Sequence, residues 1–158
     1  MLFRSGGATC TSSGDSGPAV AADRYAGSWY NPSTSGQGLI LTPYTTSQGS
    51  SLFGSWFTYA PNGQQTGGGA SQSWFTLQTQ QAGVSDSSYT ANILAGTGGV
   101  FMTPPGSNYK TVTVGTANIV FASCTSMSLT FNFTDGVNKG LSGTLPLVRL
   151  GQPPAGCQ

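Results

Sequence analysis

The sequence predicts an all-β fold: a single antiparallel β-sandwich or small barrel of about eight or nine short strands, with essentially no long helix. Its 158 residues give room for one domain. Short apolar and aromatic runs recur about every ten residues, each bounded by Gly, Pro, Asn or Asp, which is the rhythm of such folds. No window keeps a 3.6-residue apolar period over three turns, so no long helix is expected.

Three segments follow from the composition. Ser5–Ala22 are small and polar without periodicity, which predicts that residues 1–24 form a flexible arm or linker with a truncated or artificial start. Residues 25–150 form the β-domain, and residues 151–158 form a C-terminal tail tied by a disulfide. No run of 18 apolar residues occurs, so no membrane-spanning helix is expected.

The strands are expected where apolar residues alternate with polar ones or cluster between turn residues. We expect them at Gly27–Tyr30, Gly38–Tyr44, Ser51–Tyr59, Ser71–Gln78, Ser88–Leu94, Val100–Met102, Lys110–Ala122, Met127–Thr134 and Leu141–Leu150. Met127–Thr134 alternates most clearly, with four apolar side chains on one face and hydroxyl or amide groups on the other. The following Asp135-Gly136 predicts a hairpin.

Four positions carry more specific expectations. Gly115 lies where the apolar parity of its strand changes, which predicts a β-bulge. Ser51–Tyr59 has apolar residues of both parities, so either both faces are buried or one face displays aromatic side chains. Pro146 predicts an edge or bulge position, and Arg149 is expected to face outward from the last strand.

The three cysteines indicate an oxidising compartment. We expect Cys124 and Cys157 to form a disulfide, because it would tie the tail to the end of a strand and close a loop of about 33 residues. Cys10 is then left to pair with upstream sequence, with another subunit or with nothing.

The charge content excludes several classes of function. Five Lys/Arg and four Asp/Glu residues give a net charge of +1, without the basic clusters that nucleic-acid binding needs. No His is present, which removes the usual general base, the Ser-His-Asp system and most zinc sites. A surface with so little charge, hydrated by hydroxyls and amides, fits a secreted or cell-surface protein.

Other catalytic patterns are equally incomplete. Gly14-Asp15-Ser16-Gly17-Pro18 looks like a serine-protease nucleophile loop, but the chain supplies no base to activate the serine. The four carboxylates fall in the arm or in turn-like contexts, namely Asp15, Asp23, Asp86 and Asp135. They predict neither a glycosidase pair nor a calcium site, and we expect no cofactor and no enzyme activity.

Aromatic side chains are the remaining candidates for a binding site. The aromatic side chains that could form a stacking platform for sugars are Trp29, Tyr30, Trp56, Phe57, Tyr59, Trp74 and Phe75, with Asn31, Gln37, Asn62 and Gln72 as hydrogen-bonding neighbours. Among these, the candidate ligand-binding residues are Trp29, Tyr30, Asn31, Trp56, Tyr59, Asn62 and Trp74. Tyr30 and Tyr59 flank predicted turns and are the best candidates for exposure. For each tryptophan, the alternative is a place in the core.

Several motifs occur in an order that resembles a known class. They are Gly27-Ser28-Trp29-Tyr30-Asn31-Pro32 leading into Ser35-Gly36-Gln37-Gly38-Leu39, then Gly54-Ser55-Trp56-Phe57-Thr58-Tyr59 with Asn62-Gly63, and Gly143-Thr144-Leu145-Pro146-Leu147-Val148-Arg149-Leu150. The chain resembles secreted proteobacterial β-domains that occur as C-terminal modules or tandem units, with the pattern G-x-W-[WY]-N-P-x-x-S-G-x-G followed by W-F-T-Y-x-x-x-G. The resemblance covers about Tyr25 to Cys157 and implies secretion and a β-architecture; this class carries no assigned activity. The glycine-rich Gln64–Gly69 departs from its usual polar connection.

These observations favour a non-catalytic secreted or cell-surface binding module that recognises carbohydrate or a neighbouring protein through aromatic loops. The alternative is a self-assembling structural subunit of an extracellular fibre or surface layer, because no lysines guard the strand edges. A small hydrolase would require a base from sequence outside this chain.

Overall fold

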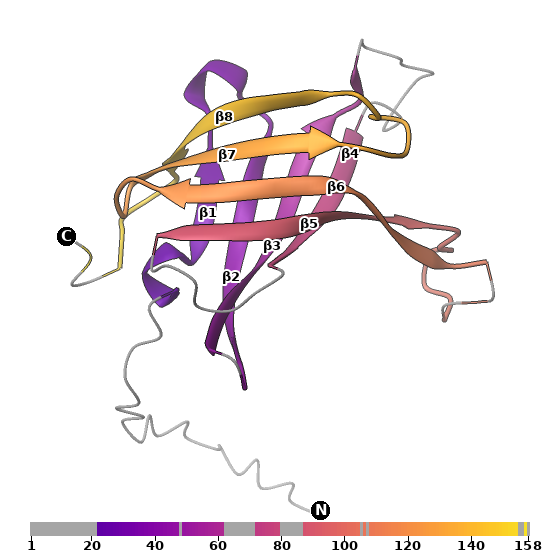
Figure 1. Ribbon diagram of the computed structural model, residues 1–158, viewed down its shortest axis with the longest axis horizontal. Coiled ribbons are helices and arrows are strands. Elements are labelled where there is room, and N and C mark those ends of the chain that lie inside the picture. Colours follow the sequence, from indigo (N-terminus) through magenta and orange to yellow (C-terminus); the bar gives the residue numbers. More distant parts are fainter. Residues whose placement is uncertain are drawn as a thin grey trace, which may run out of the picture.

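The fold is an up-and-down β-barrel (Figure 1). The computed structural model describes residues 22–47, 49–61, 72–79, 87–104, 106, 108–154 and 157. In this part of the chain eight antiparallel strands follow one another in sequence order, and the last pairs with the first. The expected all-β class is therefore confirmed, and of the two expected architectures the barrel is the one observed.

The strand bounds agree closely with the expected ones. The strands are β1 (Gly27–Tyr30), β2 (Gly38–Thr46), β3 (Gly49–Tyr59), β4 (Gln72–Thr79), β5 (Ser88–Thr97), β6 (Lys110–Phe121), β7 (Ser126–Phe133) and β8 (Ser142–Arg149). Short 3₁₀ turns precede β1 and β2, namely η1 (Asp23–Tyr25) and η2 (Pro32–Thr34). The strand expected at Val100–Met102 is wrong, since these residues lie in the β5–β6 connection.

The meander gives the barrel two distinct ends. The disulfide end holds the first residues of β1 and β7 and the last residues of β6 and β8. The opposite end, which we call the groove end, holds the last residues of β3 and the first residues of β4. The hairpin expected at Asp135-Gly136 joins β7 to β8 at the groove end, with Gly136 at φ +72°.

The expected bulge in β6 is present at Gly115. The pairing with β5 passes from Ile93–Gly115 to Leu94–Thr113, so Val114 is the extra residue. The bulge turns Val114 toward the core together with Ala117 and Ile119, although Val114 has an even residue number and the other two have odd ones. A Cβ at Gly115 would lie 2.3 Å from the carbonyl oxygen of Asn132, so the close approach of β7 requires glycine here.

Side chains fill the barrel interior. At the disulfide end Tyr25 stacks on Phe121, with ring centroids 3.6 Å apart, and Trp29 packs against the same phenylalanine. Toward the groove end Trp56 packs against Phe75, Phe131 and Phe133. Ala22 and Tyr25 belong to this core, so the packed body extends at least to Ala22, inside the segment expected to be an arm. Residues 1–21, with Cys10, lie outside the described residues.

The strand pairing that closes the barrel is short. β8 pairs with β1 only through Trp29–Arg149 and Tyr30–Val148, and the amide of Leu150 donates to the carbonyl of Ser28. Pro146 lies beyond this short pairing, so it does occupy an edge-like position, as expected. No helix in the described ranges is long and apolar enough to cross a membrane.

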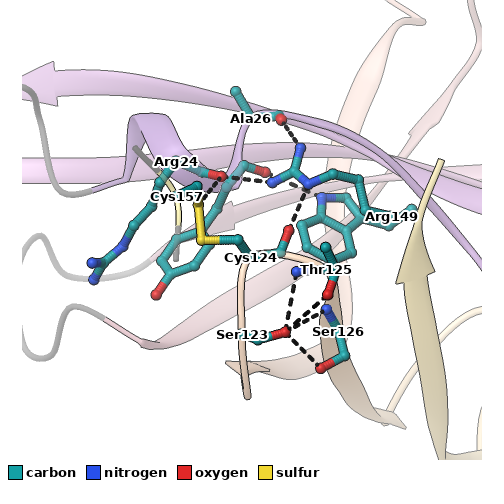
Figure 2. Close-up of a disulfide and its surroundings, with 10 residues drawn as sticks. Arg24, Ala26, Ser123, Cys124, Thr125, Ser126, Arg149 and Cys157 are labelled. Atoms are coloured by element: carbon teal, nitrogen blue, oxygen red, sulfur yellow. Dashed lines mark hydrogen bonds between the residues drawn. A yellow bond between two sulfur atoms is a disulfide. The ribbon is translucent and has the colours of Figure 1, made fainter. Parts of the chain in front are cut away.

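Arg149 and a disulfide reinforce this closure (Figure 2). The guanidinium donates from Nε to the carbonyl of Cys124 at 2.6 Å, from Nη1 to that of Ala26 at 2.5 Å and from Nη2 to that of Arg24 at 2.6 Å. It also lies over the Trp29 ring, 4.5 Å from the centroid. The outward position expected for Arg149 is therefore wrong, because the end of the barrel offers carbonyls that this side chain can pair.

The expected disulfide joins Cys124 to Cys157, with their Cα atoms 5.8 Å apart. It ties the tail to the β6–β7 turn, where the hydroxyl of Ser123 accepts hydrogen bonds from the amides of Thr125 and Ser126. Burial lowers the pKa of the nearby Arg149 guanidinium, which remains charged at physiological pH. The first and last segments of the domain are thus held together at one end.

Candidate binding site

An exposed aromatic surface lies on the outer face of β3 and β4 at the groove end. Along β3 the inward side chains, Leu52 and Trp56, are buried, whereas Phe57 and Tyr59 point outward and are 46% and 42% exposed. Trp74 on β4 is directly opposite Phe57 and is 62% exposed. Of the two alternatives for Ser51–Tyr59, the structure therefore shows one face that displays aromatic side chains.

These side chains line a groove with a volume of about 330 Å³. The lining residues are Gly36, Phe57, Thr58, Tyr59, Gln72, Ser73 and Trp74. The groove is thus built from the end of the β3–β4 pair and from the turn that leads into β2. We refer to it below as the aromatic groove.

Gly36 fixes the position of the Tyr59 ring in this groove. The glycine has φ +88°, and a Cβ built on it would lie 2.6 Å from the Tyr59 hydroxyl oxygen. A larger residue would therefore be strained in its backbone and would displace the tyrosine. The local structure therefore accounts for the glycine at position 36 of the Ser35-Gly36-Gln37-Gly38 motif.

All the lining groups of the aromatic groove are uncharged. The polar ones are hydroxyls and amides, contributed by Thr58, Gln72 and Ser73. The Thr58 hydroxyl donates to Gln37 Oε1 at 2.7 Å, which links the β2 entry to β3. Aromatic faces beside neutral donors and acceptors suit a ligand that has both apolar C–H faces and hydroxyl groups.

The structure divides the sequence-predicted site residues among several places. Of the candidates that the structure describes, Phe57, Tyr59, Gln72 and Trp74 line the aromatic groove. Trp29 and Trp56 are core residues, 1% and 5% exposed, so their assignment to a binding surface is wrong, although one edge of Trp56 reaches a smaller hollow. The indole of Trp29 donates to the Tyr25 carbonyl at 3.1 Å, so its polar atom is satisfied inside the fold.

Tyr30 and Asn31 lie at the groove end but outside the aromatic groove. Tyr30 is half-buried at the end of β1. Asn31 caps η2, where its Oδ1 accepts from the amide of Ser33 at 2.9 Å. Asn31 and Trp56 contribute to a hollow of about 70 Å³ beside β8. Asn62 lies outside the described residues.

A third hollow, of about 170 Å³, lies between the β5–β6 hairpin and the β7–β8 turn. Its walls are mostly apolar, and Asn138 is a polar member that is 5% exposed. Asn138 Oδ1 is buried without a hydrogen-bond partner. No sequence signal marks this asparagine, because its burial depends on how the turn folds back over β6.

The carboxylates that the structure describes are not brought into a cluster. Asp135 Oδ1 accepts from the amide of Gly136 at 2.8 Å, which is the turn role expected for it. Asp23 lies in η1 at the disulfide end, and Asp15 and Asp86 fall outside the described residues. Among the residues that are described, no three His, Cys, Asp or Glu side chains come close enough to hold a metal ion.

The geometry therefore points to one principal site, the aromatic groove. Gly36, Thr58 and Ser73 were not among its sequence-predicted residues, and only the glycine spacing of the β2 entry could have signalled one of them. Comparison of the chain with models of protein families, with curated proteins and with solved structures found no match.

Proposed function

We propose that this protein is a non-catalytic binding module that holds a carbohydrate in the aromatic groove. The observation that carries the proposal is a neutral groove of about 330 Å³ with three exposed aromatic side chains, Phe57, Tyr59 and Trp74. That volume is at the lower end of the range of roughly 300–1,000 Å³ that ligand pockets occupy.

Sugar rings match this surface in two ways. The C–H face of a pyranose packs on an aromatic ring, and Phe57 and Trp74 are cross-strand neighbours that extend one such surface across two strands. The hydroxyl groups of the sugar would pair with neutral donors and acceptors such as Gln72 and Ser73 at the same groove. A charged ligand would find no opposite charge among the lining residues.

A secreted or cell-surface location is part of this proposal. It is supported by the Cys124–Cys157 disulfide, since disulfides persist in oxidising compartments. It is also supported by a chain in which only 6% of residues are charged, because hydroxyl and amide groups then carry the hydration of the surface.

A structural subunit remains the alternative, and one feature favours it. β8 pairs with β1 at only two residues, so the described part of the chain shows no strand partner for Ser142–Leu147 on that side. A strand from another copy could add at this half-edge. In the described part of the chain, shorter unpaired edges of the same kind lie on β2 beyond its pairing with β1 and at the β5–β6 hairpin.

A glycan array followed by calorimetry with the bound oligosaccharides tests the carbohydrate proposal. Trp74→Ala should weaken binding about tenfold or more, because stacking on an exposed ring is lost while the barrel keeps its core. Tyr59→Ala should weaken it as well. Tyr109→Ala is the matched control, since Tyr109 is 44% exposed on the β5–β6 hairpin and does not line the groove.

Two results would count against the proposal. One is the absence of any glycan ligand with the folded wild-type protein. The other is an affinity that falls equally in the Tyr59→Ala and Tyr109→Ala variants, because this would place the ligand away from the groove. Self-association abolished by a proline at Thr144, with no glycan bound, would favour the structural alternative.

A further inference from the structure

The β5–β6 hairpin carries an exposed apolar tip at the groove end of the barrel. β5 pairs with β4 only as far as Leu94, so within the described residues Ala95–Thr97 pair only with Lys110–Val112. Figure 1 shows this hairpin projecting beyond the neighbouring strands. At its end Val100, Phe101 and Met102 are 69%, 89% and 89% exposed, and we call these three residues the apolar tip.

Part of the backbone of the apolar tip is hydrogen-bonded within the turn itself. The amide of Thr103 donates to the carbonyl of Val100 at 3.2 Å, and its hydroxyl donates to the carbonyl of Phe101 at 3.3 Å. Two carbonyls that would otherwise need water therefore have protein partners. This lowers the free-energy cost of moving the turn into a medium of low dielectric constant.

Glycine conformations shape the approach to this turn. Gly98 has φ +72°, and a Cβ there would lie 2.0 Å from the carbonyl oxygen of Asn108. The two sides of the hairpin thus approach each other closely just before the tip. Met102 has φ +53°, an uncommon conformation for a residue with a side chain, and it completes the turn.

The charge of the β5–β6 hairpin itself is favourable for an anionic or neutral surface, and the adjacent β7–β8 turn carries one charge of each sign, on Asp135 and Lys139. The sequence contains no Asp or Glu from Ser88 to Phe121, and Lys110 is exposed at the base of the turn. Tyr109, 44% exposed, lies beside it. A tyrosine and a lysine behind an apolar end are the residues that membrane proteins place at the lipid headgroups.

We propose that the apolar tip inserts into the interface of a lipid bilayer and holds the domain at a membrane surface. The tip is convex. Lipids move apart around an inserted group, so a convex tip fits a lipid interface better than it fits the wall of a second barrel. The proposal is independent of the carbohydrate site, whose residues lie on β3, β4 and the β2 entry. Three apolar side chains and one lysine predict weak, reversible attachment rather than a permanent anchor.

Vesicle flotation of the full chain tests this proposal, with vesicles of phosphatidylcholine with and without phosphatidylglycerol. The wild-type protein should float with both, and somewhat more with the anionic vesicles because of Lys110. The double variant Phe101→Ser and Met102→Ser should lower the partition coefficient at least about tenfold, because burial of both side chains is lost. Both side chains are almost fully exposed, so the barrel should fold unchanged.

Val137→Ser is the matched control, because Val137 is 92% exposed on the β7–β8 turn and outside the apolar tip. It should leave flotation within about twofold of the wild type. A Phe101→Trp variant should give a blue-shifted emission when vesicles are added. The proposal is overturned if the wild type does not float, if the control loses as much as the double variant, or if the tip instead drives self-association in sedimentation experiments without lipid.

Discussion

Replacing Arg149 by methionine tests how the barrel is held closed. The side chain donates three hydrogen bonds to the carbonyls of Arg24, Ala26 and Cys124, and it lies over the Trp29 ring. These contacts join the segment before β1, the β6–β7 turn and the last residue of β8. Methionine keeps much of the apolar stem and removes every donor.

The magnitude follows from these contacts. Hydrogen bonds that involve a charged group contribute about 1.5–3 kcal/mol each, and a cation over an indole contributes about 0.5–2 kcal/mol. The guanidinium is partly desolvated, which is why its pKa is lowered, and this desolvation opposes the gain. We therefore expect Arg149→Met to lower the free energy of unfolding by about 3 kcal/mol, much less than the contacts would give separately.

Urea unfolding followed by tryptophan fluorescence, with the disulfide kept oxidised, is the assay. A loss of this size should lower the urea midpoint by about 1.5 M with little change in the slope. Arg24→Met is the control, because the contribution of Arg24 to the cluster is its backbone carbonyl, which the substitution keeps. Its side chain lies over Tyr25, so its loss should cost less than about 1 kcal/mol. A midpoint for Arg149→Met equal to that of Arg24→Met would refute the reasoning.

Two further substitutions test packing. Asn138→Leu should raise the free energy of unfolding by about 1 kcal/mol, because it removes a buried oxygen that lacks a hydrogen-bond partner. Thermal unfolding measures this gain, and the control Asn132→Leu, on the exposed face of β7, should show none. An Asn138→Leu variant less stable than the wild type would contradict the reading of Asn138 Oδ1 as an unpaired buried oxygen. Gly115→Ala should lower the free energy of unfolding by about 2 kcal/mol, because the added methyl meets a neighbouring carbonyl at 2.3 Å. Gly106→Ala meets no atom within 4 Å and should change it little in the same urea titration, so equal effects of the two alanines would show that the bulge does not depend on glycine.

Local patterns were sufficient to predict most of the strands. The alternation in Met127–Thr134 and the parity change at Gly115 each report on one strand and its faces, so the sequence predicts β7 and the β6 bulge well. Val100–Met102 is different, because three apolar residues alone do not show whether they pair or project. The positive φ of Gly98 and the turn at Val100–Thr103 decide this, and neither is visible from hydrophobicity.

The candidate site was harder to predict, because the exposure of a side chain depends on which face of the barrel wall it lies on and not on residue type. Trp29, Trp56 and Trp74 look alike in the sequence, yet the first two point inward and the third points outward. β3 is apolar at both parities, so its pattern leaves open which face holds the core. Arg149 follows the inward parity of Leu147 and meets backbone carbonyls that belong to segments far away in the sequence.

The two-residue pairing of β1 with β8 has a consequence for how the chain folds. Every other pair of neighbouring strands is joined by a single connection, so those hairpins can form early with a small loss of loop entropy. The two extremes of the domain meet at this pairing and in the Arg149 cluster beside it, as in the bond from Arg149 to Ala26 across 123 positions. We therefore expect closure of the barrel to be a late step of folding. The rate of that step should depend on the Arg149 guanidinium more than on any single hairpin.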